Sequence, residues 1–331
     1  MSSHRYKVYV TRLIPEKGLG LLRGRVELDV HQGELPPTHD ALIRHARDKD
    51  GLLSLLTDKI DAGLMANCPN LRVISNYAVG FDNIDVEAAT KRGIVVTNTP
   101  GVLTETVADF AWALLMASAR RVVEADRFTR AGRWKTWGPT LLCGTDVFGK
   151  TLGIIGAGRI GSSVARRAAG FNMHVLYTDV AKKEELEKEI GARFVGLEEL
   201  LAESDFVSLH VSLADKTHHL IGERELKKMK PTAVLINTSR GPVVDQEALY
   251  HALKSKVIGG AALDVFEEEP IRASNRLLKL DTVVVAPHIS SASIETREKM
   301  AVMAAQGLLD ALSGNEPKFI VNPEVWQSRK G

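Results

Sequence analysis

Cysteine, aromatic residues and an excess of either charge are all scarce in this sequence of 331 residues. The two cysteines, Cys68 and Cys143, are too few for the disulfide framework of a secreted scaffold, and no cysteine and histidine cluster has metal-ligand spacing. We therefore expect no metal site and a reducing, cytoplasmic environment. Because 43 lysines and arginines are balanced by 41 acidic residues, for a net charge of +2, the chain lacks the electrostatic signature of nucleic-acid binding.

Long hydrophobic runs are also missing. Residues 1–20 lack the apolar core of a signal peptide, and the longest uncharged apolar stretch, residues 110–119, is too short to span a bilayer. We therefore expect a cytoplasmic protein that does not interact with a membrane. The length, with 44% hydrophobic and 25% charged residues, predicts about two globular domains.

Short apolar runs alternate with helical patterns through most of the chain. The first hundred residues contain KVYV, VELDVH, GLLSLL and LRVISN, and a second series from residue 151 contains TLGIIG, HVLYTD, DFVSLHV, AVLINTS, GGAALDV and TVVVAP. Such runs are typical of parallel strands buried on both faces, so the second half predicts a doubly wound α/β sheet. Residues 102–131 predict a long helix connecting the domains. Residues 293–313 predict a final amphipathic helix that ends before Gly314.

A glycine-rich turn follows the strand pattern TLGII. Gly156, Gly158 and Gly161 form G-x-G-x-x-G, with Arg159 and Ile160 inside it, and a helical pattern follows. The first glycine permits a tight turn, the second lets a pyrophosphate approach the backbone, and the third lets the helix pack closely on the strand. Because methyltransferases also use this turn, it predicts a nucleotide-type ligand rather than a reaction.

The next apolar run, HVLYTD, ends in Asp179. This is near the offset of about 20 residues at which an acid accepts hydrogen bonds from the ribose hydroxyls of NAD. Its carboxylate would repel the 2′-phosphate of NADP, so we expect NAD as the cofactor. Lys182 and Lys183 follow closely and soften this preference, which leaves NADP as the less favoured alternative.

Three longer blocks resemble the signatures of the D-isomer-specific 2-hydroxyacid dehydrogenase family: LINTSRGPVVDQEAL, GGAALDVFEEEP and VVVAPHISSAS. NYAVGFDNID, NTPGVLTETVADFAWALLM and GKTLGIIGAGRIG extend the resemblance over nearly the whole chain. The resemblance implies an α/β protein of two doubly wound parallel-sheet domains. These would be a flavodoxin-like substrate domain, residues 1–100 and 290–331, and a Rossmann NAD-binding domain, residues 101–289.

The same resemblance assigns three catalytic residues. Arg240 would bind a 2-oxo acid through its planar guanidinium. His288 would transfer the proton to or from the substrate oxygen, and Glu269 would orient the imidazole and favour its charged form. Each residue alone could be an ordinary surface side chain, so their order within the three blocks carries the assignment.

The resemblance also implies binding residues. Cofactor contacts are expected, besides the glycine turn and Asp179, at Thr238, Ser239, Arg240, Asp264, His288, Ser290 and Ser291. Ser290 departs from the glycine that many relatives have at this position. For the substrate, we expect backbone N–H groups at Val79 and Gly80 to bind the carboxylate, and Leu53 to form a wall of the pocket.

Residues 132–150, GRWKTWGPTLLCGTDVFGK, resemble the glyoxylate and hydroxypyruvate reductases within the family. In that subgroup the tryptophan matching Trp137 is supplied to the neighbouring subunit, which implies a homodimer and a small substrate. The alternative is that Trp134 and Trp137 only pack the connecting segment. The sequence does not choose between glyoxylate and hydroxypyruvate.

We therefore predict an enzyme that reduces a small 2-oxo acid with NADH. One alternative is an NAD-sensing binding protein similar to the C-terminal-binding-protein corepressors, which share the fold and the catalytic trio. The other is a phosphite- or formate-type dehydrogenase on the same scaffold. The tryptophan-containing segment argues against this second alternative.

Overall fold

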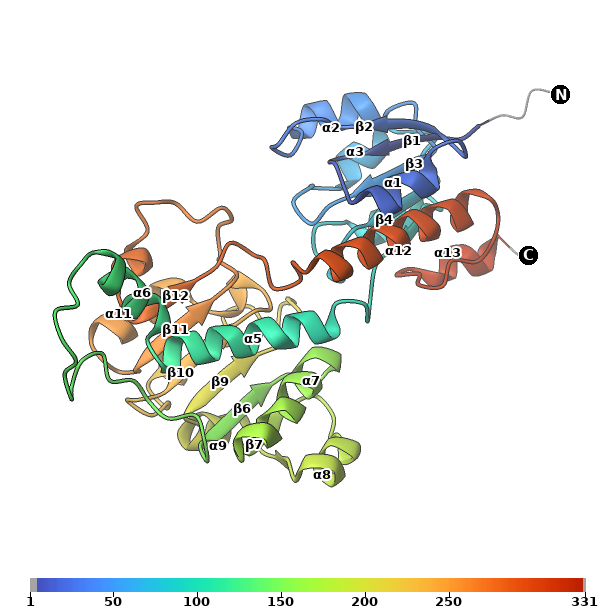
Figure 1. Cartoon of the computed structure of the whole chain (residues 1–331). Coiled ribbons are helices and arrows are strands. Elements are labelled where there is room, and N and C mark those ends of the chain that lie inside the picture. The colour runs from blue at the N-terminus through green and yellow to red at the C-terminus, as the bar shows by residue number, and fades with distance from the viewer. Residues whose placement is uncertain (1–4, 330–331) are drawn as a thin grey trace. The chain divides into compact units, whose positions relative to one another are not determined.

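Two parallel sheets, of five and seven strands, organise the chain in the computed structural model, which describes residues 5–329 (Figure 1). They belong to two units. Unit 1 is formed by residues 5–103 and 292–329 of the described chain, and unit 2 by residues 104–291. The predicted fold class, α/β with two doubly wound parallel sheets, is confirmed.

The sheet of unit 1 has the strand order β2-β1-β3-β4-β5, in which the chain reverses direction across the sheet between β1 and β3. Its strands are β1 (Lys7–Val10), β2 (Glu27–Val30), β3 (Gly51–Ser54), β4 (Val73–Asn76) and β5 (Val95–Thr97). Its helices are α1 (Glu16–Leu22), α2 (His39–Ala46), α3 (Ala62–Ala66), α4 (Val86–Lys91), α12 (Ile294–Leu312) and α13 (Pro323–Ser328). The apolar runs predicted the first four strands, whereas the three-residue β5 and helix α13 were missed.

The predicted final helix is confirmed as α12. Ser293 caps its first turn by accepting a hydrogen bond from the Thr296 N–H at 3.2 Å, and Gly314 follows its end with a φ of 79°. Helix α12 packs on β3, β4 and β5 and lies against α1. The contact with α1 is very close, because a Cβ at Gly18 would lie 2.7 Å from Ala301. Helix α12 thus returns the chain from unit 2 to the core of unit 1.

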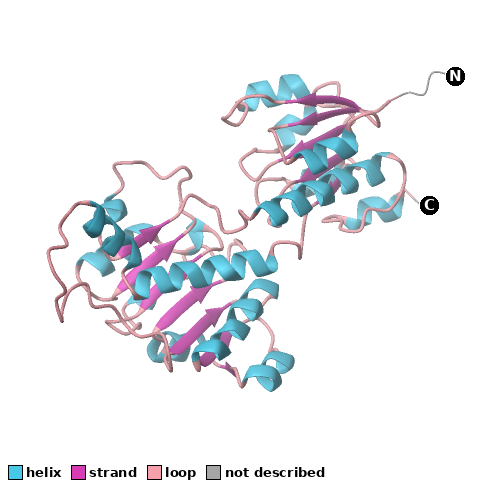
Figure 2. Ribbon diagram, in the orientation of Figure 1, coloured by secondary structure: helices cyan, strands magenta, loops and turns pink. Residues whose placement is uncertain are grey.

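The sheet of unit 2 has the order β12-β11-β10-β9-β6-β7-β8, and helices lie on both of its faces (Figure 2). Its strands are β6 (Thr151–Ile155), β7 (His174–Thr178), β8 (Arg193–Phe194), β9 (Phe206–Leu209), β10 (Val234–Asn237), β11 (Gly260–Leu263) and β12 (Val283–Val285). Its helices are α5 (Thr104–Ala119), α6 (Val122–Arg130), α7 (Arg159–Arg167), α8 (Glu184–Ile190), α9 (Leu197–Glu203), α10 (Glu223–Leu226) and α11 (Gln246–Lys254). Three short 3-10 helices complete unit 2: η1 (Ala168–Phe171), η2 (Gly241–Val243) and η3 (Arg276–Lys279). The chain reverses across this sheet between β6 and β9, next to the glycine turn.

The prediction of one long helix over residues 102–131 is wrong. The structure has two helices, because the chain turns at Arg121, whose φ of 53° is left-handed and ends a right-handed helix. The Arg121 guanidinium holds the turn through two hydrogen bonds of 2.8 Å to Glu124. Helix α5 is also more than a connector, because it is buried in the core of unit 2, whereas α6 has no buried residue.

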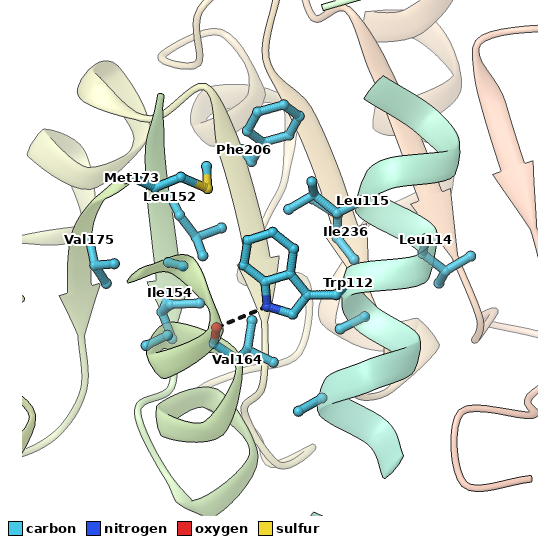
Figure 3. Close-up of a cluster of buried hydrophobic side chains, with 14 of the residues drawn as sticks. Trp112, Leu114, Leu115, Leu152, Ile154, Val164, Met173, Val175, Phe206 and Ile236 are labelled. Atoms are coloured by element: carbon cyan, nitrogen blue, oxygen red, sulfur yellow. Dashed lines mark hydrogen bonds between the residues drawn. The ribbon is translucent and has the colours of Figure 1, made fainter. Parts of the chain in front are cut away.

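Trp112 shows how α5 is fixed in that core (Figure 3). Its ring stacks on Phe171 with centroids 4.8 Å apart, and its indole N–H donates a 3.0 Å hydrogen bond to the Val164 carbonyl on α7. Leu152 and Ile154 of β6 belong to the same buried cluster. The cluster therefore sets α5 and α7 against the strand that leads into the glycine turn.

Candidate active site

The three glycines of the turn after β6 have distinct environments. Gly156 has a φ of 92°, and a Cβ there would lie 2.8 Å from the His210 backbone. A Cβ at Gly161 would lie 2.0 Å from the Gly156 carbonyl oxygen, so the close packing of α7 requires glycine. Gly158 is exposed, and a Cβ there would meet nothing within 4 Å. Two glycines thus build the turn, while the middle one leaves its outer side open to a ligand.

Helix α7 begins at Arg159, which is exposed, and Ile160 is half-buried beside the unit-2 core. The Gly158 cap has no side chain, so the first N–H groups of the helix receive no side-chain acceptor from their cap. A nine-residue helix that starts at an open glycine turn is a favourable place for a phosphate group. The open side of the turn at Gly158 and the first turn of α7 together fit the pyrophosphate of a dinucleotide.

Asp179 directly follows β7. Its side chain is 14% exposed, one oxygen accepts the Val180 N–H at 2.6 Å, and the other lies 3.8 Å from the Lys183 ammonium. Lys182 instead pairs with Glu187 at 2.9 Å. Of the two lysines that soften the predicted preference for NAD, the structure therefore brings only Lys183 to the Asp179 carboxylate.

The register of three neighbouring strands gathers the predicted catalytic blocks. Asn237 at the end of β10 lies beside Leu263 at the end of β11, which lies beside Val285 at the end of β12. Arg240 and His288 each come three residues after one of these strand ends, and the Glu269 loop follows β11. Because the strands are parallel, all three turns leave the same edge of the sheet.

Asn237 shapes the turn that carries Arg240. Its Nδ2 donates to the Arg240 carbonyl at 2.9 Å, and its Oδ1 accepts from the Ser239 N–H at 3.0 Å and from the Ser239 hydroxyl at 2.8 Å. A Cβ at Gly241 would lie 1.9 Å from the Phe266 backbone, so this turn packs directly on the loop that leads to Glu269. Neither Asn237 nor Gly241 was predicted, although both lie within the block around Arg240.

Glu269 and His288 form a direct pair. The His288 Nδ1 lies 2.7 Å from one Glu269 oxygen, and the other oxygen accepts the Phe266 N–H at 2.9 Å. Burial alone would raise the pKa of the Glu269 carboxyl, but His288, the Phe266 N–H and the Arg240 charge together hold that pKa below its usual value. Since the acid is a carboxylate, His288 donates from Nδ1, which leaves Nε2 for another partner.

Asp264 anchors the backbone of His288. Its side chain is 0% exposed, and its two oxygens accept the N–H groups of Ile289 and Ser290, both at 2.8 Å. Its carbonyl accepts the His288 N–H at 2.8 Å. These bonds hold His288 at a φ of 55°, a conformation that non-glycine residues adopt rarely. Both Asp264 oxygens thus hold the His288 turn, and the expected contact of Asp264 with the cofactor stays a prediction.

The remaining predicted cofactor residues lie at this edge as well. The Thr238 Oγ1 is buried and has no hydrogen-bond partner among the described residues. Ser239 and Ser291 are half-buried, and the Ser290 side chain is buried. An orphaned buried hydroxyl one residue after β10 and an open cradle after β6 both fit a dinucleotide that lies along this edge.

Three predicted substrate residues lie in unit 1. Val79 and Gly80 follow β4 and are half-buried, and their carbonyls accept hydrogen bonds from Asn98 at 2.8 Å and from Asn76 at 2.9 Å. Leu53 differs from expectation, because its side chain is 0% exposed within β3. The side chain therefore packs inside unit 1, and a pocket wall at Leu53 stays a prediction.

Trp134 and Trp137 lie in a segment, residues 131–150, that contains no helix or strand. Their exposed fractions are 60% and 78%, and Phe148 at the end of the segment is 67% exposed. The alternative that both tryptophans only pack the connecting segment does not fit these exposures. Large exposed aromatic groups on one segment are typical of a surface that another protein covers.

No helix between residues 5 and 329 is long and apolar enough to cross a membrane. Within the same range, no three side chains of histidine, cysteine, aspartate or glutamate are placed so that they could hold a metal ion.

Comparisons with known proteins agree with the geometry. Residues 112–290 match the family model described as D-isomer specific 2-hydroxyacid dehydrogenase, NAD binding domain. The chain is 58% identical over 324 residues to a glyoxylate reductase of Korarchaeum cryptofilum, with 98% of both chains covered. It is 53% identical over 328 residues to a glyoxylate reductase of Thermococcus gammatolerans, again with 98% of both covered.

Solved structures are similar over almost the whole chain. A protein of Thermus thermophilus superposes with a TM-score of 0.91 at 46% identity and covers 95% of this chain and 99% of its own. An NADPH-dependent glyoxylate/hydroxypyruvate reductase of Sinorhizobium meliloti, in complex with NADP and malonate, has a TM-score of 0.85 at 32% identity. That match covers 96% of this chain and 97% of the relative.

Proposed function

Because the chain belongs to the D-isomer-specific 2-hydroxyacid dehydrogenase family, we propose that it reduces glyoxylate, and hydroxypyruvate as a second substrate, to the 2-hydroxy acid. The observation that carries this proposal is the 2.7 Å pair of His288 and Glu269 at the sheet edge where the Arg240 turn also ends. The identity to glyoxylate reductases over 98% of the chain supports the choice of substrate.

Arg240 binds the substrate in this proposal. Its guanidinium is always charged and offers paired N–H donors, so it can hold the carboxylate and draw electron density from the carbonyl oxygen. The Asn237 clamp and the packing of Gly241 on Phe266 fix the backbone from which this side chain extends. Lysine would present a single rotating charge and would orient the carbonyl less well.

His288 transfers the proton. Glu269 accepts its Nδ1–H, so Nε2 protonates the carbonyl oxygen as the alcohol forms and takes the proton back in the reverse reaction. Glu269 remains a carboxylate because its pKa is lowered, and it offsets the positive charge of the imidazolium. Asp264 keeps the His288 backbone in its left-handed conformation, which aims the ring.

The cofactor is held by the glycine turn and the start of α7, with Thr238, Ser239, Ser290 and Ser291 along the same edge. When bound, it supplies the hydride that adds to the substrate's carbonyl carbon. Asp179 accepts the ribose hydroxyls and disfavours a 2′-phosphate, so NAD is preferred over NADP. Lys183, 3.8 Å from Asp179, reduces this preference.

Replacing Asp179 by alanine tests the cofactor proposal. The ratio of kcat/KM with NADH to that with NADPH should fall by about tenfold or more, because the variant loses the ribose acceptor and leaves Lys183 to attract a phosphate. Asp215→Ala, on the loop after β9, is the matched control for the loss of a carboxylate. An unchanged ratio would show that Asp179 has only a structural role.

We also propose a homodimer in which residues 131–150 of each chain are covered by the partner and Trp137 reaches the partner's substrate pocket. The exposed fractions of Trp134 and Trp137 support this arrangement. Sedimentation of the purified protein tests the dimer. Trp137→Ala tests the contact, because it should raise the KM for the 2-oxo acid.

Turnover by the purified protein tests the function itself. Oxidation of NADH and NADPH is followed with glyoxylate, hydroxypyruvate, pyruvate and phenylpyruvate, alongside NAD reduction with phosphite and with formate. Glyoxylate should give the highest kcat/KM. Turnover of phosphite or formate alone would support the dehydrogenase alternative, and NADH binding without any turnover would support the regulatory binding protein.

A further inference from the structure

Three consecutive peptide groups after β4 have their carbonyls held by the same neighbouring part of unit 1. The Ala78 carbonyl accepts the Thr99 N–H at 2.9 Å, the Val79 carbonyl accepts the Asn98 Nδ2 at 2.8 Å, and the Gly80 carbonyl accepts the Asn76 Nδ2 at 2.9 Å. The donors come from two neighbouring strand ends: Asn76 is the last residue of β4, and Asn98 and Thr99 follow β5. One short turn therefore carries three separate anchors on its carbonyl side.

The orientation of the N–H groups follows from these anchors. In a trans peptide the N–H points opposite to the carbonyl of the same peptide group. The three held carbonyls therefore turn the N–H groups of Val79, Gly80 and Phe81 away from Asn98 and Asn76. In residues 5–329 none of these three N–H groups donates a hydrogen bond. Successive backbone N–H donors without a partner are groups that can bind an anion.

One of the anchors, Asn76, is itself fixed by buried polar groups. Asn76 is 0% exposed, and its Oδ1 accepts the hydroxyl of Ser54, also 0% exposed, at 3.0 Å. The Asn76 Nδ2 also reaches the Asn83 Oδ1 at 3.0 Å. Asn83 in turn donates to the carbonyls of Leu55 and Asp58, both at 3.1 Å. This network ties the turn to the loop after β3, so its conformation exists before any ligand arrives.

Resting on the proposed function, we infer that Asn98 and Asn76 are positioning residues for the substrate carboxylate, and that the Phe81 N–H joins those of Val79 and Gly80 in binding it. The two amides contact only the carbonyl side of the turn. Their effect on the substrate therefore passes through the peptide groups. Because a carboxylate is bound alike in the ground state and the transition state, losing an anchor should raise KM and leave kcat nearly unchanged.

Two variants of Asn98 separate positioning from charge. Asn98→Leu keeps much of the side-chain shape and removes the donor without adding charge. Asn98→Asp replaces the donor by an oxygen that repels the Val79 carbonyl. Both should raise the KM for glyoxylate, by about tenfold for the loss of one well-placed donor, with kcat and the NADH affinity within about twofold of the unaltered protein. Asn67→Asp is the matched control, because its Nδ2 donates to the Gly63 carbonyl at 2.9 Å on the surface of the same unit.

A binding measurement keeps this inference separate from the proposed function. Oxalate is titrated calorimetrically into the NADH-saturated protein, which needs no turnover. Weaker binding by both Asn98 variants and unchanged binding by the Asn67 control would support the inference even if no 2-oxo acid were reduced. The inference is overturned if the unaltered protein does not bind oxalate, if the three variants bind equally well, or if only Asn98→Asp raises KM, since charge alone would then explain the effect.

Discussion

At the carboxyl edges of both sheets, buried polar side chains hold the turns that follow the strands, but the turns carry different groups. In unit 1, buried Asn76 at the end of β4 holds a turn that presents backbone N–H groups. In unit 2, buried Asn237 at the end of β10 and buried Asp264 after β11 hold turns that present Arg240 and His288. At both edges a buried amide or carboxylate fixes a turn, and the residues in the turn decide whether it carries unpaired peptide N–H groups or charged side chains.

His288→Gln should have the largest effect in this comparison. It removes the proton donor but retains the turn, so kcat should fall by about 10²- to 10⁴-fold. NADH affinity, measured by fluorescence titration, should hardly change. His251→Gln is the control, because His251 pairs with Glu247 at 2.9 Å on the exposed face of α11. A rate within about twofold of the unaltered protein would remove His288 from its proposed role.

Two isosteric variants, one that changes an acid to an amide and one that changes an amide to an acid, test whether the two sheet edges affect different kinetic constants. Asp264→Asn places an amide against a backbone N–H, and Asn76→Asp places a carboxylate oxygen against a carbonyl. Each should lower the free energy of unfolding by about 1–3 kcal/mol, because a buried polar group loses its partner. Urea unfolding measures this loss of stability. In steady-state assays, Asp264→Asn should mainly lower kcat, and Asn76→Asp should mainly raise KM. The comparison fails if both variants change the same kinetic constant.

The two units also contain acids whose pKa values shift in opposite directions. Burial raises the pKa of the Asp58 carboxyl in unit 1, although Thr11 at 2.5 Å and the Leu55 N–H at 2.7 Å oppose the shift. In unit 2, burial would raise the pKa of Glu269, but its partners hold that pKa below 4.5. Glu269 therefore stabilises the fold above pH 4.5, and this contribution is lost as pH falls through its folded pKa. The contribution of Asp58 is largest below pH 3.8 and is lost as pH rises through its folded pKa.

Glu269→Gln and Asp58→Asn should therefore change the pH dependence of unfolding in opposite senses. When the pH is lowered from about 5.5 to about 4.0, the unaltered protein should lose part of its stability advantage over Glu269→Gln. Over the same pH range, its free energy of unfolding should rise relative to that of Asp58→Asn. The change for Glu269 should be under about 1 kcal/mol, because its side chain is 32% exposed. Chemical denaturation at both pH values measures the two differences. Parallel trends for the two variants would contradict the assigned shifts.

The two cysteines differ in burial, and the reactivity of their thiols gives the prediction with the smallest expected effect. Cys68 in unit 1 is 2% exposed, and burial raises the pKa of its thiol to about 11, whereas Cys143 in the 131–150 segment is exposed. One thiol per chain should react rapidly with Ellman's reagent in the folded protein, and the second only after denaturation. A folded protein with two fast thiols would contradict the packing of unit 1. One with none would place Cys143 under the proposed partner subunit.

Much of the fold could be predicted from the sequence, because short apolar runs and a glycine turn are local patterns. The runs predicted ten of the strands, and missed β5 and β8, which are only three and two residues long. The helix over residues 102–131 was predicted too long, because the pattern continues past Arg121 while the backbone turns there. Within the candidate site, Arg240, Glu269 and His288 were predicted together only because their blocks resemble a family.

The sequence alone was enough to predict the parallel strands, the glycine turn at Gly156 and the order of the three proposed catalytic side chains. The tertiary structure was needed to show that Asp264 supports the His288 turn and that Asn76 and Asn98 hold the turn after β4. The physical reason is that the anchoring side chains bind backbone groups, which every residue carries. A carbonyl or N–H has no signature in the sequence, so its partner is known only when the chain has brought the two together.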